Sequence, residues 1–235
     1  MATLLLVDDA AALAELFAAA IERELGHQVH TVVSLAEVAA SLTLIETPDL
    51  ALVDLSFPQE KGTGLEALVE IHAGSPATRL AIITQGDEWV AEVLRDAWDL
   101  LPITTVISKS APLAYQLGAI TQVLTTGSAP VDPAIQPLLP AQRNPQRTPE
   151  RFARLVQHAG HAKLWLALYH CTDANYKALA DHSGLKLNTL KNYRAQLVDE
   201  LLSHGLDDPT LFNMHRFAIR CWPFLEPFVT NPNPM

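Results

Sequence analysis

Five short apolar segments rich in strand-forming residues alternate with segments of helical periodicity over the first 125 residues. Apolar residues in a buried strand form a continuous run, whereas those on one face of a helix recur every three or four positions. This alternation predicts βα units, whose right-handed crossovers place helices on both faces of a parallel sheet. We therefore predict an α/β domain with a doubly wound, five-stranded parallel sheet. The expected strands are 3–7, 28–33, 49–53, 79–83 and 103–107, and the expected helices are 11–25, 35–46, 64–73, 87–99 and 112–125.

The expected helix 11–25 carries an apolar stripe at helical spacing, and Gly26 is placed to end it. We expect this stripe to face the sheet, and its members are Leu13, Leu16, Phe17, Ala20 and Ile21.

Polar side chains follow four of the five expected strands. Asp54 follows the apolar run 49–53, and Pro58 and Gly62 break the strand before the next helix begins. Parallel strands gather their carboxyl ends at one edge of the sheet, which is where open α/β sheets bind ligands. The side chains expected to meet at this edge are Asp8, Asp9, Asp54, Thr84 and Lys109.

The chemistry of this set points to phosphoryl transfer. Three carboxylates within a few ångströms repel one another, so they either take up protons or hold a hard divalent cation such as Mg²⁺. Mg²⁺ can bridge to a phosphoryl oxygen while a carboxylate attacks phosphorus. The hydroxyl of Thr84 and the ammonium of Lys109 could hold the remaining phosphoryl oxygens. The sequence thus predicts a site that forms an aspartyl phosphate.

Residues 1–126 resemble the receiver domain of bacterial two-component response regulators, which has a flavodoxin-like fold. The resemblance is carried by the acidic pair, by Asp-Leu-x-x-Pro with a glycine eight positions after the Asp, and by the Thr and Lys that end the last two strands. It implies that a sensor histidine kinase supplies the phosphoryl group and that Asp54 accepts it. It further implies Mg²⁺ ligands at Asp8, Asp9, Asp54 and the Ser56 backbone carbonyl, and phosphoryl contacts from Thr84 and Lys109.

Two residues depart from the receiver pattern. Receivers often carry an aromatic switch residue three positions before the Lys, where this chain has Val106, and a small residue after the Thr, where it has Gln85. These differences leave two alternatives open. The chain could be a pseudo-receiver that keeps the site residues for folding, or a transcription regulator that works without phosphorylation.

Residues 127–147 separate the predicted receiver from a second domain. Six prolines between residues 127 and 149 favour a semi-extended linker. The alternative is an irregular connection that docks on the receiver through Ile135, Leu138 and Leu139. Charge also changes here: residues 1–140 hold 5 Lys and Arg against 18 Asp and Glu, whereas residues 141–235 hold 11 against 8, so the two halves suit different partners.

Residues 148–235 are predicted to be helical, over 149–158, 161–170, 175–182, 187–203 and 209–221. Asn175 is expected to cap a short helix, Ser183-Gly184 to form a turn, and the next helix to bury Leu190, Tyr193, Leu197 and Leu201. A helix, a short glycine-containing turn and a second helix with a basic and amidic outer face predict a helix-turn-helix. The residues expected to contact DNA are Asn188, Thr189, Lys191, Asn192 and Arg194.

Residues 163–206 resemble the DNA-binding domain of LuxR/NarL-type regulators. Leu179-Ala180, the run 189–194 and Leu201 stand at the positions of that family's signatures. The resemblance implies an all-α output domain that binds double-stranded DNA, with the protein acting as a homodimer. Phosphorylation would either promote dimerisation or release the output domain. The open alternative is a helical domain that binds protein or RNA.

Other features of the sequence limit the class of protein that this chain can be. The two cysteines predict neither a disulfide framework nor a metal site, and no signal region or long apolar run is present, so we expect a soluble cytoplasmic protein. No feature predicts an enzyme beyond self-phosphorylation and its reversal. The four prolines at 223, 227, 232 and 234 predict that the C-terminal tail is not helical.

Overall fold

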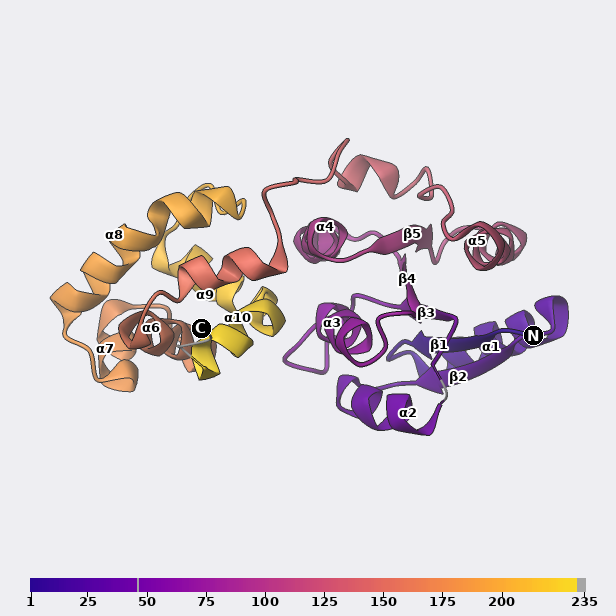
Figure 1. The fold of residues 1–235 in the computed structure, drawn as a ribbon, viewed down its shortest axis with the longest axis horizontal. Coiled ribbons are helices and arrows are strands. Elements are labelled where there is room, and N and C mark those ends of the chain that lie inside the picture. Colours follow the sequence, from indigo (N-terminus) through magenta and orange to yellow (C-terminus); the bar gives the residue numbers. More distant parts are fainter. Residues whose placement is uncertain (46, 232–235) are drawn as a thin grey trace. The chain divides into compact units, whose positions relative to one another are not determined.

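A computed structural model describes residues 1–45 and 47–231 of the chain. The chain folds into two compact units, residues 1–143 and residues 144–235, which are described separately below (Figure 1). Within the described ranges, no helix combines the length and the apolar character needed to cross a membrane.

The first unit contains a five-stranded, fully parallel sheet in the order β2-β1-β3-β4-β5, which confirms the predicted fold class. The expected helices 35–46 and 87–99 each begin with a 3₁₀ turn, and residue 46 lies outside the described residues. The strands are β1 (Thr3–Val7), β2 (Gln28–Val32), β3 (Leu50–Val53), β4 (Arg79–Thr84) and β5 (Ile103–Ser108). The helices are α1 (Ala11–Leu25), η1 (Leu35–Glu37), α2 (Val38–Leu44), α3 (Gly64–Gly74), η2 (Glu88–Val90), α4 (Ala91–Leu100), α5 (Leu113–Thr126) and η3 (Gln136–Leu138).

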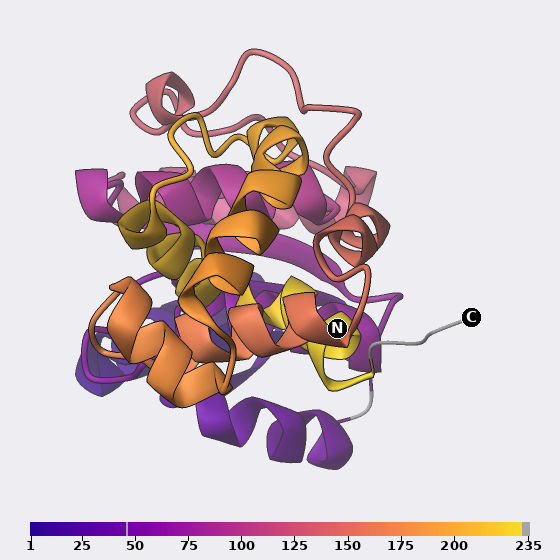
Figure 2. The ribbon, with the colours of Figure 1, turned by 90° about the vertical axis from the view of Figure 1, so that its left-hand side faces the viewer.

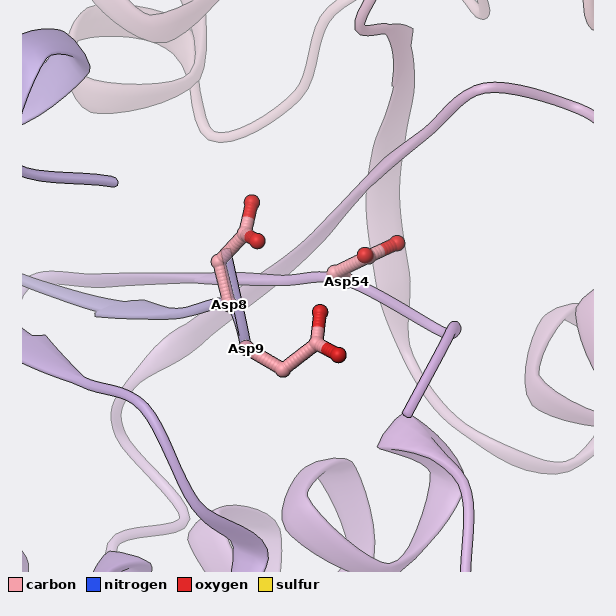
Figure 3. A group of neighbouring side chains, drawn as sticks. All are labelled: Asp8, Asp9 and Asp54. Carbon is pink, nitrogen blue, oxygen red and sulfur yellow. The ribbon is translucent and has the colours of Figure 1, made fainter. Parts of the chain in front are cut away.

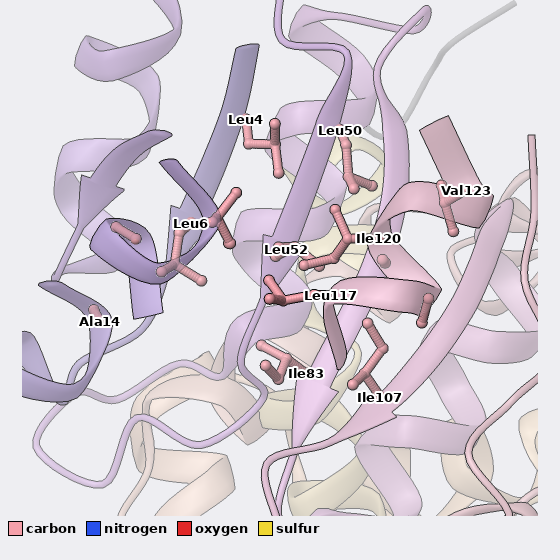
Figure 4. Close-up of a cluster of buried hydrophobic side chains, with 14 residues drawn as sticks. Leu4, Leu6, Ala14, Leu50, Leu52, Ile83, Ile107, Leu117, Ile120 and Val123 are labelled. Carbon is pink, nitrogen blue, oxygen red and sulfur yellow. The ribbon is translucent and has the colours of Figure 1, made fainter. Parts of the chain in front are cut away.

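Helices cover both faces of the sheet, with α1 and α5 on one face and α2, α3 and α4 on the other (Figure 1). The strand side chains alternate between these two faces, as the pleat of a sheet requires. The core under α1 and α5 is continuous from strand to strand (Figure 4). Its strand members are Leu4, Leu6, Leu50, Leu52, Ala81, Ile83 and Ile107, and its helix members include Ala14, Ile21, Leu117, Ile120 and Val123.

Helix α1 buries only part of the predicted stripe: Ala20 and Ile21 are buried, whereas the two leucines are not. Leu13 and Leu16 are 61% and 69% exposed, whereas the small residues Ala14 and Ala18 lie buried against the sheet. The two leucines were therefore wrongly placed in the core. Alanine at the contact lets the helix approach the strands closely. The periodicity of apolar residues does not take side-chain size into account, so it could not predict this choice.

Residues 129–143, which we call the strap, dock on the first unit after α5. The Ala129 and Asp132 N–H groups donate to the Thr104 and Val106 carbonyls at 3.2 and 2.9 Å, beside the edge strand β5. Ile135 is 1% exposed and Leu139 8%. Of the two alternatives for residues 127–147, the structure therefore has the docked connection (Figure 1).

The second unit is all-helical, in agreement with the sequence (Figure 2). Its interior is aromatic: Phe152, Trp165 and Phe217 are fully buried, and the Trp165 indole N–H donates to the Leu155 carbonyl at 2.8 Å. The Asn175 side chain caps α7 by accepting the Ala178 N–H at 2.9 Å, as expected. The elements are η4 (Pro149–Leu155), α6 (Ala159–His170), α7 (Tyr176–Ser183), α8 (Leu187–Ser203), α9 (Leu211–Arg220) and α10 (Trp222–Thr230).

The segment Trp222–Thr230 is helical, so the prediction of a non-helical tail was wrong for this stretch. Pro223 lies in the first turn, where its missing N–H has no intrahelical partner in any case. Pro227 lies inside the helix, but Phe224, Leu225 and Val229 are buried, and this packing offsets the lost hydrogen bond. Residues 232 and 234 lie outside the described residues.

Candidate functional site

Three aspartates meet at the carboxyl edge of the sheet (Figure 3). Val7 of β1 pairs with Val53 of β3, and the Asp54 N–H continues this ladder by donating to the Val7 carbonyl at 2.9 Å. Asp8 and Asp54 therefore leave the sheet side by side. One carboxylate oxygen from each of Asp8, Asp9 and Asp54 lies within 4.8 Å of the others, and no second group of this kind occurs among the described residues.

Lys109, at the end of β5, neutralises part of this charge. Its ammonium lies 2.7 Å from an oxygen of Asp8 and 2.7 Å from an oxygen of Asp54. Burial raises the pKa of the Asp54 carboxyl, and the hydrogen bond and charge of Lys109 oppose that rise. Burial by itself would lower the pKa of Lys109, but the bonds to Asp54 and Asp8 outweigh burial and raise it. The lysine is thus held charged between two carboxylates.

Thr84 and Ser56 lie at and just after the ends of the two neighbouring strands β4 and β3. Thr84 ends β4, beside β3, and is 1% exposed; its hydroxyl accepts the Gly86 N–H at 3.3 Å, and its carbonyl accepts the Lys109 N–H at 2.8 Å. The Leu55 N–H donates to Asp54 at 2.7 Å, and the backbone of Ser56 lowers the Asp54 pKa. The fold thus brings Asp8, Asp9, Asp54 and Lys109 together, and it joins Thr84 to them through the backbone of Lys109.

Similarity to solved structures covers both units. A LuxR-family two-component response regulator from Aurantimonas sp. SI85-9A1 is 26% identical, with a TM-score of 0.50, over 58% of this chain and 94% of that one. The N-terminal unit is a receiver domain. The RcsB response regulator of Salmonella typhimurium, 14% identical with a TM-score of 0.50, matches 92% of this chain and 98% of its own, and so shares the fold. Comparisons with protein-family models and with curated proteins give no match.

In this receiver domain, Gln116 fixes the loop that carries Lys109, a role that the sequence did not reveal. Gln116 lies on α5 and is 7% exposed, and its amide nitrogen lies 3.0 to 3.1 Å from three carbonyls, those of Ser108, Lys109 and Ala111. Glutamine near the start of a helix is common on surfaces, so its identity alone carried no signal.

Gly64 is a second residue of the receiver domain that the sequence did not single out. A Cβ atom there would lie 1.8 Å from the Asp54 carbonyl oxygen, so only glycine allows α3 to begin this close to the end of β3. The Gly64 N–H donates to the Leu55 carbonyl at 3.3 Å. The Thr63–Glu66 capping box then starts the helix.

Outside the receiver domain, α8 presents the residues predicted to contact DNA. Asn188, Lys191 and Asn192 are exposed, and Thr189 is half-buried. Arg194 is also half-buried, and the fold already uses its guanidinium: Nε donates to the Pro209 carbonyl at 2.7 Å, and Nη1 lies 3.3 Å from the Tyr176 hydroxyl.

Proposed function

We propose that this chain is a cytoplasmic response regulator that accepts a phosphoryl group on Asp54 from a sensor histidine kinase. The observation that carries the proposal is the convergence of three carboxylates and Lys109 at the carboxyl edge of a receiver sheet. In this proposal residues 1–126 are the receiver, 127–147 the connection, and 148–235 the DNA-binding output.

The carboxylate of Asp54 attacks phosphorus, and the bond from phosphorus to the donor histidine nitrogen breaks, which leaves an acyl phosphate and a free imidazole. The ammonium of Lys109 and the hydroxyl of Thr84 hold the phosphoryl oxygens. Carboxylates suit Mg²⁺, and Asp8, Asp9, Asp54 and the Ser56 carbonyl would hold this ion. Mg²⁺, when bound, neutralises charge on the phosphoryl group during transfer.

The intact mass of the protein after exposure to a small-molecule phosphodonor tests this proposal. We expect an adduct of one phosphoryl group that forms with Mg²⁺ and fails to form without it, because the acidic cluster repels an anionic donor unless a cation is present. The Asp54→Asn variant should show no adduct, since an amide is a poor nucleophile. A phosphoryl group found on another residue would contradict the assignment.

We further propose that the output domain binds DNA with α8 as its recognition helix. Through this binding the protein regulates transcription. Three of its exposed polar residues can reach DNA: Lys191 can pair with phosphate or guanine, and Asn188 and Asn192 can pair with adenine. Thr189 and Arg194 complete the proposed contact set. A homodimer would place two such helices on half-sites about 34 Å apart.

Selection of duplexes from a random-sequence DNA pool, followed by binding measurements at several salt concentrations, tests the output. The Lys191→Ala variant should weaken binding about tenfold and reduce the salt slope by about one, because one phosphate contact is lost. Asp199→Asn, an exposed change on the same helix, is the matched control. Enrichment from an RNA pool but not from DNA would favour the alternative, an RNA-binding output.

A further inference from the structure

The strap lies against β5, which is the edge strand of the sheet. Besides the two backbone bonds given above, the Thr105 hydroxyl donates to the Pro130 carbonyl at 2.9 Å. Two arginines clamp the rest of the strap. Arg95 of α4 donates to the Leu138 carbonyl at 3.0 Å, and Arg143 donates to the carbonyls at both ends of the α4–β5 turn, Leu101 and Ile103, at 2.7 and 2.6 Å.

One end of the strap contacts the turn that follows Thr84. Gly86 has a positive φ of 81°, and a Cβ added there would lie 2.6 Å from the Ile135 side chain and 3.5 Å from that of Leu138. Ile135 therefore packs directly on the Gly86 backbone. The same Gly86 donates its N–H to the Thr84 hydroxyl, so one residue joins the strap to the proposed phosphoryl-binding hydroxyl.

The strap also contacts the strand end that carries Lys109. Asp132 is 5% exposed, and its Oδ2 lies 3.4 Å from the Ser108 backbone nitrogen, one residue before Lys109. Its Oδ1 accepts the Ala134 N–H at 2.8 Å, which fixes the bend before Ile135. The strap thus contacts the neighbours of both proposed phosphoryl-binding side chains, Thr84 and Lys109.

We infer that the strap is the element that senses phosphorylation: it docks when Asp54 is unmodified and is released when Asp54 is phosphorylated. This inference rests on the proposed function. In this inference the Thr84 side chain turns toward a phosphoryl oxygen, and its hydroxyl moves away from the Gly86 N–H. When it turns, the Gly86 N–H loses its acceptor, the turn shifts, and Ile135 loses the flat backbone surface on which it packs.

The strap provides a residue that can respond to a movement of Thr84, which β5 does not. Val106 is fully buried and has no polar or aromatic group that could report a movement of Thr84. Ile135 contacts the turn after Thr84 from outside the sheet. If Ile135 moves away from this turn, the strap becomes more exposed to solvent. Phosphorylation weakens strap docking by some factor, and linkage requires that strap docking disfavours phosphorylation by the same factor. A substitution that loosens the strap must therefore favour the phosphorylated state.

Hydrogen exchange on the full chain tests this inference, with Mg²⁺ and beryllofluoride as the phosphoryl mimic. We expect the amides of Ala129 and Asp132, which now donate to β5, to exchange about tenfold faster when the mimic is bound. Asp54→Asn should show no change. Unaltered protection in a protein to which calorimetry shows that the mimic has bound would overturn the inference.

A second arm does not need phosphorylation. Thr84→Val keeps the shape of the side chain but removes the acceptor of the Gly86 N–H, so strap exchange should rise severalfold without any mimic. No rise would overturn the coupling. If the mimic fails to bind at all, the proposed function fails, and this arm still decides whether the strap responds to Thr84.

Substitution in the strap tests the reverse direction. Ile135→Ala should tighten beryllofluoride binding about fivefold, since the docked state that opposes the mimic is weakened. Gln136→Ala, an exposed change in the same turn, should leave the affinity unaltered. Equal affinities for Ile135→Ala and the wild-type protein would contradict the inference.

Discussion

The Gly64→Ala variant should lose about 4 kcal/mol or more of its free energy of unfolding, enough to unfold much of the receiver domain. The added methyl would overlap the Asp54 carbonyl, and its other close neighbours, the Asp54 carbonyl carbon and the Leu55 Cα, are also backbone atoms. Because the added Cβ would overlap backbone atoms, no change of side-chain rotamer can relieve the overlap. Relief requires α3 to shift away from β3, which would break the packing of Leu65 and Leu68. Chemical denaturation followed by circular dichroism measures the loss.

Gly118→Ala is the matched control. Gly118 lies in the interior of α5, and a Cβ there would meet no atom within 4 Å. Alanine should therefore stabilise the helix by roughly 0.5 to 1 kcal/mol, since glycine loses more backbone entropy on folding. A Gly64→Ala variant as stable as Gly118→Ala would show that α3 does not approach Asp54 this closely.

The helical unit should lose about 3 kcal/mol of stability as the pH falls from about 6.5 to about 4. His204 is 2% exposed, and burial, with the charge of Arg147, lowers its pKa to about 4 against the opposing charge of Glu200. Below the ordinary pKa of about 6.5, His204 is protonated in the unfolded chain but stays neutral in the folded chain. Folding therefore becomes less favourable as the pH falls. Below about pH 4 both states are protonated and this loss stops growing. Denaturation monitored by the buried Trp165 and Trp222 follows the unit.

Substituting His204 isolates its share of this pH dependence. The His204→Leu variant keeps an apolar side chain near Phe152 and should flatten the stability profile between pH 6.5 and 4. His182→Gln, which changes an exposed histidine, is the control. Trp89→Phe and Trp98→Phe in all variants remove the receiver's fluorescence. A His204→Leu profile as steep as that of the control would assign the pH dependence to other groups.

The sheet and most of the candidate site could be predicted because strand ends are marked locally. An apolar run followed by Asp54, or by Ser108-Lys109, fixes both the strand and the side chain that leaves it. Parallel pairing then brings those ends together without further information. The helix-turn-helix boundaries followed similarly from Asn175 and Gly184.

What could not be predicted depends on three-dimensional distances. The sequence drew attention to Gly62, but only at Gly64 would an added Cβ meet a backbone carbonyl. Arg194 is a residue type that often contacts DNA, and only the fold reveals that its Nε and Nη1 already bond to Pro209 and Tyr176. The prolines favoured a semi-extended linker over the docked strap, because they indicate how a segment extends and carry no information on what it contacts.

The strap also determines how the sheet terminates. An uncovered edge strand offers unpaired N–H and C=O groups to any other extended chain, and so acts as a template for aggregation. Ala129 and Asp132 occupy this position beside Thr104 and Val106. A receiver fragment cut after residue 126 would expose that edge, whereas one cut after residue 143 would keep it covered. The segment that resembles a linker in sequence is therefore part of what keeps the receiver from associating edge to edge.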